Sequence, residues 1–274
     1  MSLSFGPQNA YTKAPRIAGG QKMPSVAIFL PGLFAGSWIW SSQIEIMKAK
    51  GYEPIVFNDP FVKFGKGYGT VPSLINFVKD ALRPRQQADA VVFGNSMGGY
   101  IALALASDPD FNIKQAIVSG CPGAGENVTL GLGVSRILSL DYAHKISREL
   151  FHDPSRLDTE MIESTFREIA NRQCFMMGLS ILRSLQKIDV REFIDKVAVD
   201  THLIWGAHDR VTPIQPWCDM AAASPFLHLH SIADAGHCPM IETPDAFNDV
   251  LERVLYTGPA PHSSDLPREA RPTY

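Results

Sequence analysis

Residues 94–98 constrain the fold of this chain more than any other feature. They read Gly-Asn-Ser-Met-Gly and separate a short apolar run, 90–93, from a longer apolar segment, 97–107. A Gly-x-Ser-x-Gly turn between a strand and a helix is typical of a nucleophile elbow, in which a strained serine stands clear of the sheet. The pentapeptide alone also fits a glycine-rich turn with an idle serine. Ser96 is therefore a candidate nucleophile that needs partners elsewhere in the chain.

Two later segments supply an acid and a base. Asp209 follows an apolar run, 201–205, and His237 follows another, 227–232. A serine hydroxyl needs a base to take its proton and an acid to orient that base. Because catalytic groups in open α/β sheets gather beyond the carboxyl ends of the strands, we expect these loops to converge near Ser96. Asp234, three residues before His237, is the alternative orienting acid.

Three segments, 93–99, 205–209 and 236–242, resemble signatures of the α/β-hydrolase family, and the resemblance covers most of the chain. It implies an α/β fold of the α/β-hydrolase type, with a mostly parallel sheet flanked by helices and a helical cap insertion. Carried over by position, Ser96 is the nucleophile, Asp209 the triad acid and His237 the general base. The order Ser, Asp, His agrees with this family.

Residues 31–36 follow the apolar run 26–30 and resemble the oxyanion loop of the same family. The resemblance implies that the backbone N–H groups of Leu33 and Met97 stabilise the oxygen anion that forms during the reaction. Pro31 stands where the family usually has histidine. This departure affects the shape of the loop and leaves the Leu33 donor in place. An ordinary strand-to-helix turn is the alternative interpretation.

Apolar runs and helical patterns alternate along the chain, which predicts a parallel sheet with helices on its faces. The expected strands are 26–30, 54–57, 90–93, 115–119, 201–205 and 227–232. The expected helices are 37–50, 71–82, 97–107, 213–223 and 244–256.

Residues 122–196 show helical periodicity without strand-like runs. A helix is expected to begin near Asp158. The resemblance implies a cap over the active site, and surface helices without substrate contact are the alternative. The predicted organisation is a hydrolase core in two parts (1–121 and 197–257), a cap (122–196) and a tail expected to be disordered (258–274). Phe175, Met176 and Met177 could line a pocket, but such a face is more often core.

Composition narrows the function classes. The chain has 274 residues, 45% of them hydrophobic, and a net charge of −3 without a basic stripe, so nucleic acid is not an expected partner. The amino-terminal residues lack a signal pattern and no segment fits a membrane span, which favours a cytoplasmic protein. The four cysteines form no C-x-x-C pair and are expected to be free thiols.

Several further residues have plain structural interpretations. Cys238 is expected to be structural, and Glu242 is expected to anchor the last helix. His228 and His230 would share one face of a strand, but the sequence offers no neighbouring carboxylate or thiol to complete a metal site. Either Trp38 or Trp40 could wall the pocket.

These features predict acyl transfer to water, with a carboxylic ester of a small organic molecule as the substrate and with no cofactor or metal. The same groups could serve a carbon–carbon bond hydrolase or lyase, a thioesterase or a lactonase. A non-catalytic small-molecule-binding protein on this fold is the alternative from another class. A nicotinamide enzyme is disfavoured, because the glycines at 65–69 and 123–125 do not complete G-x-G-x-x-G. The oligomeric state is not predicted.

Overall fold

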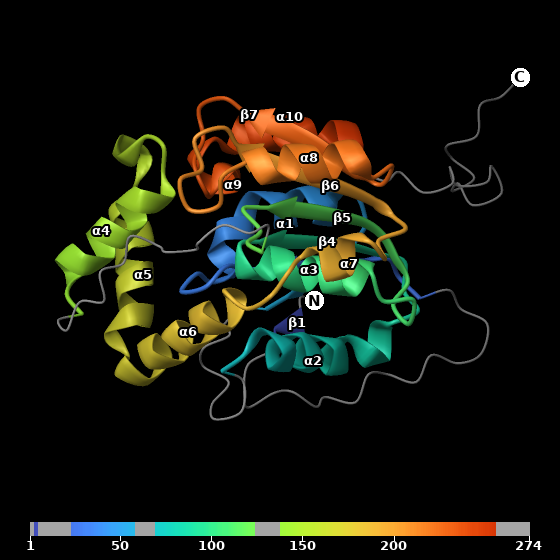
Figure 1. Ribbon diagram of the computed structural model, residues 1–274, viewed down its shortest axis with the longest axis horizontal. Coiled ribbons are helices and arrows are strands. Elements are labelled where there is room, and N and C mark those ends of the chain that lie inside the picture. The colour runs from blue at the N-terminus through green and yellow to red at the C-terminus, as the bar shows by residue number, and fades with distance from the viewer. Residues whose placement is uncertain (1–2, 5–22, 58–68, 124–137, 256–274) are drawn as a thin grey trace, which may run out of the picture.

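The computed structural model describes residues 3–4, 23–57, 69–123 and 138–255 (Figure 1). Within these ranges, seven strands form one sheet in the order β1-β3-β2-β4-β5-β6-β7. All of the pairings are parallel, as the alternation of strands and helices predicts. The predicted tail, 258–274, lies outside the described residues.

The six predicted strands are confirmed, and β1 is an addition that the sequence did not predict. Strands β4, β5 and β6 are each longer than expected. The strands are β1 (Leu3–Ser4), β2 (Val26–Leu30), β3 (Glu53–Val56), β4 (Ala90–Asn95), β5 (Ile113–Ser119), β6 (Asp200–Gly206) and β7 (Leu227–Ile232).

The predicted helices are also found, although the first begins as a 3-10 turn, η1 (Ser37–Trp40), before α1 (Ser41–Ala49). None of the described helices combines the length and the apolar character needed to cross a membrane. The others are α2 (Val71–Leu82), α3 (Met97–Ala106), α4 (Leu140–Leu150), α5 (Thr159–Ala170), α6 (Arg172–Leu185), α7 (Arg191–Ile194), α8 (Gln215–Ala223), α9 (Pro239–Glu242) and α10 (Pro244–Val254), with short 3-10 turns η3 (Arg83–Arg85) and η4 (Pro154–Arg156).

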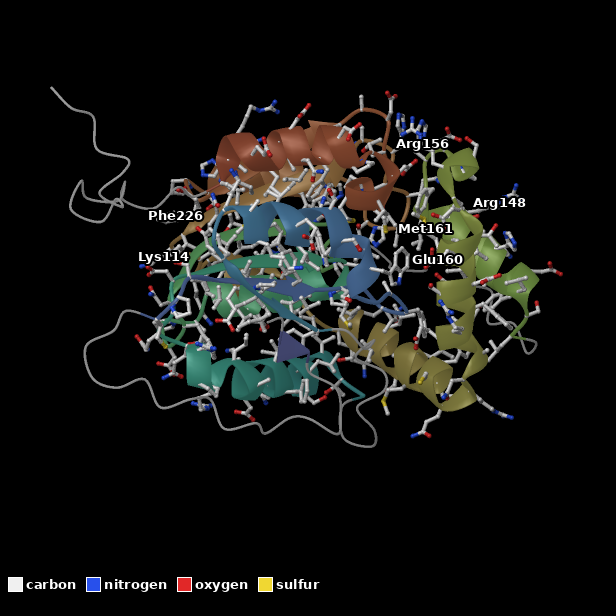
Figure 2. The ribbon with its side chains drawn as sticks, turned by 180° about the vertical axis from the view of Figure 1, so that it is seen from behind. Lys114, Arg148, Arg156, Glu160, Met161 and Phe226 are labelled. Atoms are coloured by element: carbon white, nitrogen blue, oxygen red, sulfur yellow. The ribbon has the colours of Figure 1, made fainter. Side chains whose placement is uncertain are left out.

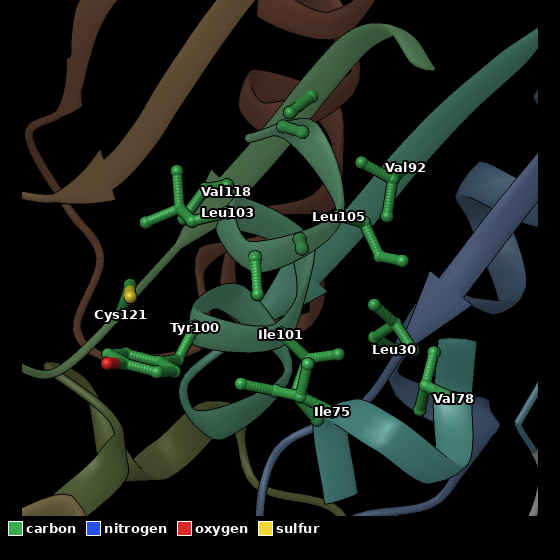
Figure 3. Packing of buried hydrophobic residues seen from close by; sticks show 14 of the residues in the cluster. Leu30, Ile75, Val78, Val92, Tyr100, Ile101, Leu103, Leu105, Val118 and Cys121 are labelled. Atoms are coloured by element: carbon green, nitrogen blue, oxygen red, sulfur yellow. The ribbon is translucent and has the colours of Figure 1, made fainter. Parts of the chain in front are cut away.

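Helices cover both faces of the sheet because side chains alternate along each strand. In β2, Ile28 packs in a core with α2, α3 and α8, whereas its neighbour Phe29 packs in a second core with α1 and α10. Figure 3 shows α3 in the first core, with Ile101 beside Ile75 of α2. Helix α3 is buried along its whole length, which fixes the end that carries residue 96.

Helices α4, α5 and α6, here called the helical insertion, stand together to one side of the sheet (Figure 1). They pack around a third, smaller core that includes Tyr142, Ile162 and Phe175. Helix α5 begins as predicted, since the Asp158 side chain accepts a hydrogen bond from the backbone N–H of Met161. The insertion thus has its own apolar centre.

Strands β6 and β7 bring three histidines together at one place. Nδ1 of His202 lies 3.1 Å from Nε2 of His230, and the His202 ring stacks on His228 with ring centroids 4.9 Å apart. His228 also contacts Asp200, a carboxylate that the sequence reasoning missed because it lies on the neighbouring strand. The described residues contain no group of three or more such side chains arranged to hold a metal ion.

This cluster makes stability depend on pH. Burial, reinforced by His230 and His228, lowers the pKa of His202 to about 4, so the unfolded chain takes up this proton first as the pH falls below about 6.5. We expect the free energy of unfolding to decrease between pH 6.5 and 4, by about 1–2 kcal/mol from His202, because solvent around this half-buried ring screens part of the effect. Urea unfolding at these pH values should show that the free energy of unfolding decreases less for His202→Gln than for the wild-type protein. Equal decreases in the two proteins would contradict this assignment.

Candidate active site

Ser96 occupies a strained turn between β4 and α3. Its φ of 54° and ψ of −123° lie in a region that non-glycine residues rarely adopt. Its backbone N–H donates to the carbonyl of Ser119 on β5 at 2.8 Å, which holds the turn against the sheet. A methyl group at Gly94 or Gly98 would collide with neighbouring backbone. Ser96 therefore lies, as predicted, on a strained strand-to-helix turn that needs glycine on either side.

Asp209 and His237 form a buried pair. Nδ1 of His237 lies 2.9 Å from Oδ2 of Asp209, and the backbone N–H groups of Val211 and Thr212 each donate to Oδ1 of Asp209 at 2.9 Å. The Thr212 hydroxyl donates to Oδ2 at 2.8 Å. Burial alone would raise the pKa of Asp209, but the His237 ring and the Thr212 hydrogen bonds hold it below the usual value. Asp234 is exposed and does not contact His237 through a hydrogen bond.

Ser96 and His237 line the same pocket. Among the hydrogen bonds of the described residues, none joins the Ser96 hydroxyl to the His237 ring. Hydrogen bonds in substrate-free active sites are often long and shorten when substrate binds. The three predicted residues are thus brought together, with the acid–base pair already bonded and the serine beside it.

The two predicted oxyanion donors also lie at this pocket. Met97 is the first residue of α3, where backbone N–H groups have no partner within the helix. Leu33 lies in the loop after β2, and neither its N–H nor that of Met97 donates to another described residue. Two unpartnered N–H groups beside Ser96 are what a developing oxygen anion requires.

Phe34, which follows Leu33, ties this loop to the helical insertion. Its φ of 59° is unusual for a residue with a bulky side chain. Its ring stacks on Phe175 of α6, with centroids 5.9 Å apart, and covers Gly178 of the same helix. A methyl group at Gly178 would collide with the Phe34 ring. The loop after β2 is thus packed directly against α6 through the Phe34 ring.

We expect Gly178→Ala to lower kcat by at least about tenfold with a smaller change in KM. Displacing Phe34 is expected to shift the neighbouring N–H of Leu33, a predicted oxyanion donor, and loss of one such donor costs about 10²–10³ in kcat elsewhere. Steady-state kinetics on a p-nitrophenyl ester would measure kcat and KM of the variant and of the wild-type protein. Met176→Ala, at an exposed position on the same helix, is the control. Unchanged kcat in Gly178→Ala would show that α6 does not position the loop.

Glu242 holds the histidine loop against the end of α4. Its buried carboxylate accepts hydrogen bonds at 2.7 Å from the backbone N–H groups of Gly236 and Asp153. The expectation that it anchors the last helix is therefore wrong, because one carboxylate oxygen accepts from Gly236 in the histidine loop and the other from Asp153 in the segment after α4. The backbone N–H of His237 donates to Leu150 at 2.7 Å, so the insertion and the histidine are joined twice.

The pocket has a volume of about 850 Å³ including its opening. The loop after β2, the turn at Ser96 and the loop that carries His237 form one side, and helices α4, α5 and α6 form the other. Met161 is on the side of the insertion that faces the sheet (Figure 2). The described residues that line the pocket include no Lys, Arg, Asp or Glu side chain. The described lining of the pocket is therefore largely apolar.

The remaining predictions have mixed outcomes. Trp38 lines the pocket, whereas Trp40 is buried in the core and donates to the carbonyl of Leu30. Met176 is 52% exposed and does not line the pocket, while Met161, which the sequence reasoning passed over, does. Burial raises the pKa of the Cys238 thiol, helped by nearby carboxylates, so this residue is a poor nucleophile.

Comparisons with known proteins agree with this architecture. Residues 27–250 match the model of the alpha/beta hydrolase family. A 2-hydroxy-6-oxononadienedioate/2-hydroxy-6-oxononatrienedioate hydrolase from Pseudomonas sp is 23% identical over 252 residues, which is 84% of this chain and 87% of that protein.

Solved structures show the same fold at lower identity. An esterase from Exiguobacterium antarcticum superposes with a TM-score of 0.69 at 16% identity, over 85% of this chain and 91% of the other. A 2-hydroxy-6-oxo-6-phenylhexa-2,4-dienoate hydrolase from Rhodococcus sp. strain RHA1 superposes with a TM-score of 0.69 at 17% identity, over 84% of this chain and 89% of the other. The relatives are thus carbon–carbon bond hydrolases and esterases, and the chain belongs to the alpha/beta hydrolase family.

Proposed function

We propose that this protein is a serine hydrolase that cleaves an uncharged carboxylic ester with a largely apolar acyl group. The pocket carries this proposal, because Ser96 and His237, which is bonded to Asp209, meet there, and the described side chains around them are mostly apolar. The nucleophile, the base and the oxyanion donors are all groups of the protein, so the reaction requires no metal or cofactor.

In the proposed reaction, the Ser96 hydroxyl attacks the ester carbonyl while Nε2 of His237 takes its proton. Asp209 holds Nδ1–H of His237 and stabilises the positive charge on the ring. The proton then passes from His237 to the leaving alcohol, and an acyl-enzyme forms on Ser96. Water activated by His237 releases the acid and restores the serine.

The backbone N–H groups of Leu33 and Met97 would hold the oxygen anion in both steps. The helical insertion would act as a cap, since α4, α5 and α6 close the pocket opposite Ser96. Excluding water from this space strengthens the hydrogen bonds to the anion. We therefore propose that the helical insertion selects the substrate, and that residues in the loops after the strands carry out the reaction.

Carbon–carbon bond hydrolysis is the second candidate, because relatives with that activity match most of the chain. The name of the Pseudomonas relative denotes a substrate with two carboxylates. A buried carboxylate needs a cationic partner, and none of the described residues lining this pocket provides one. This observation favours the neutral ester.

A matched pair of esters distinguishes the two candidates. p-Nitrophenyl hexanoate and the mono-p-nitrophenyl ester of adipic acid share the same chain, but the second ends in a carboxylate. We expect kcat/KM to be at least about a hundredfold lower for the adipate ester, because desolvating an unpaired carboxylate costs several kcal/mol. Equal or faster turnover of the adipate ester would contradict the neutral-ester proposal and favour the dicarboxylate class.

A further inference from the structure

Two hydroxyl groups of the helical insertion face the pocket that contains Ser96. Ser147 lies on α4 and Thr165 on α5, with 3% and 8% of their surfaces exposed, and both line the pocket. They come from helices that are consecutive in the chain and packed against each other. The wall that the insertion gives to the pocket therefore carries two hydroxyl groups on neighbouring helices.

Neither hydroxyl has a hydrogen-bond partner among the described residues. A serine or threonine inside a helix normally bonds to a backbone carbonyl about one turn earlier or faces solvent. In this protein Ser107 and Thr243 do the first, since they donate to Ala104 and Pro239. Ser147 and Thr165 do not donate to a backbone carbonyl of the described residues, and neither residue is on an exposed surface. Both side chains are largely buried and their hydroxyls open into the pocket, so a bound molecule is what could supply the hydrogen bond that the described fold does not.

The surroundings of these hydroxyls define what they would bind. Their neighbours along the pocket wall are apolar, with Ile146 and Leu150 on α4 and Met161 on α5. A hydroxyl can donate or accept one hydrogen bond but carries no charge. The fitting partner is an uncharged oxygen, as in a ketone, an ether or an alcohol.

We propose that Ser147 and Thr165 form a subsite for an uncharged oxygen atom in the part of the substrate away from the cleaved bond. This inference rests on the proposed ester hydrolysis and narrows its substrate class. The substrate is an ester whose apolar acyl chain carries one further neutral oxygen, and a plain hydrocarbon chain leaves the two hydroxyls unpaired.

Three esters of equal chain length test the subsite: p-nitrophenyl hexanoate, 4-oxohexanoate and 5-oxohexanoate. We expect the wild-type protein to prefer one of the oxo esters over the hexanoate by at least about tenfold in kcat/KM, because a site built for a hydrogen bond discriminates against analogues that lack it. Ser147→Ala and Thr165→Val should each lower kcat/KM for the preferred oxo ester about tenfold more than kcat/KM for the hexanoate. Ser164→Ala is the matched control, because the Ser164 hydroxyl accepts a hydrogen bond from Arg167 of the same helix, α5.

Thermal unfolding gives a second readout that does not depend on activity. Thr165→Val removes a hydroxyl that makes no hydrogen bond to the described residues and nearly keeps the shape of the side chain, so Tm should stay the same or rise. A lower Tm would show that the hydroxyl is bonded within the fold and would overturn the inference.

The failures are distinguishable. If the wild-type protein hydrolyses the hexanoate but prefers neither oxo ester, or if both variants change all three esters in parallel, the subsite is wrong and ester hydrolysis stands. If no ester is hydrolysed by the folded protein, the proposed function fails and this inference fails with it.

Discussion

Replacing Ser96 with alanine is expected to lower kcat for p-nitrophenyl hexanoate by about 10⁶-fold, because the nucleophile and its base act as one unit. The fold should survive, since alanine experiences the same backbone strain as serine at a φ of 54°. Tm measured alongside the kinetics would confirm this. Ser107→Ala makes the same chemical change at the opposite end of α3 and should leave kcat unaltered. Retention of activity in Ser96→Ala would mean that another group attacks the substrate.

The second large effect is expected at Asp209. In Asp209→Asn, the asparagine side chain would occupy the same space, but its amide would favour the wrong tautomer of His237 and would not stabilise a charged ring. A comparable change in another triad lowers kcat by about 10⁴, and we expect a loss of that order here. The pKa of Asp209 lies below its usual value, so its carboxylate stays ionised at neutral pH.

Asp234→Asn is the matched control for Asp209, because Asp234 was the alternative orienting acid and is exposed. Its kcat should stay within about twofold of the wild-type value. A large loss in Asp234→Asn together with activity in Asp209→Asn would reverse the assignment of the acid.

The sheet and the elbow could be predicted from sequence because their determinants are local. The bounds of strand β2 were predicted correctly, because its five consecutive apolar residues are followed directly by Pro31. The turn at Ser96 was predictable because its glycines are close in sequence and are required by close backbone contacts. Asp209 and His237 followed from the rule that loops beyond parallel strands converge.

The contacts of the helical insertion could not be predicted, because they join segments distant in sequence. Phe34 meets Gly178 across more than a hundred residues, and its positive φ has no signal in the residue type. Thr165 and Ser147 fall on amphipathic helices whose periodicity shows a buried face but does not say that this face lines a pocket. Glu242 was placed wrongly for the same reason, since its partner Asp153 lies in another part of the chain.

The central claim is that Ser96 is an activated nucleophile, and labelling with a fluorophosphonate tests it most directly. Intact mass would be measured for the wild-type protein and for Ser96→Ala after the same treatment. The account predicts one adduct on the wild-type protein, located by peptide sequencing at Ser96, and none on the variant. An adduct on both proteins, or none on folded wild-type protein, would contradict it.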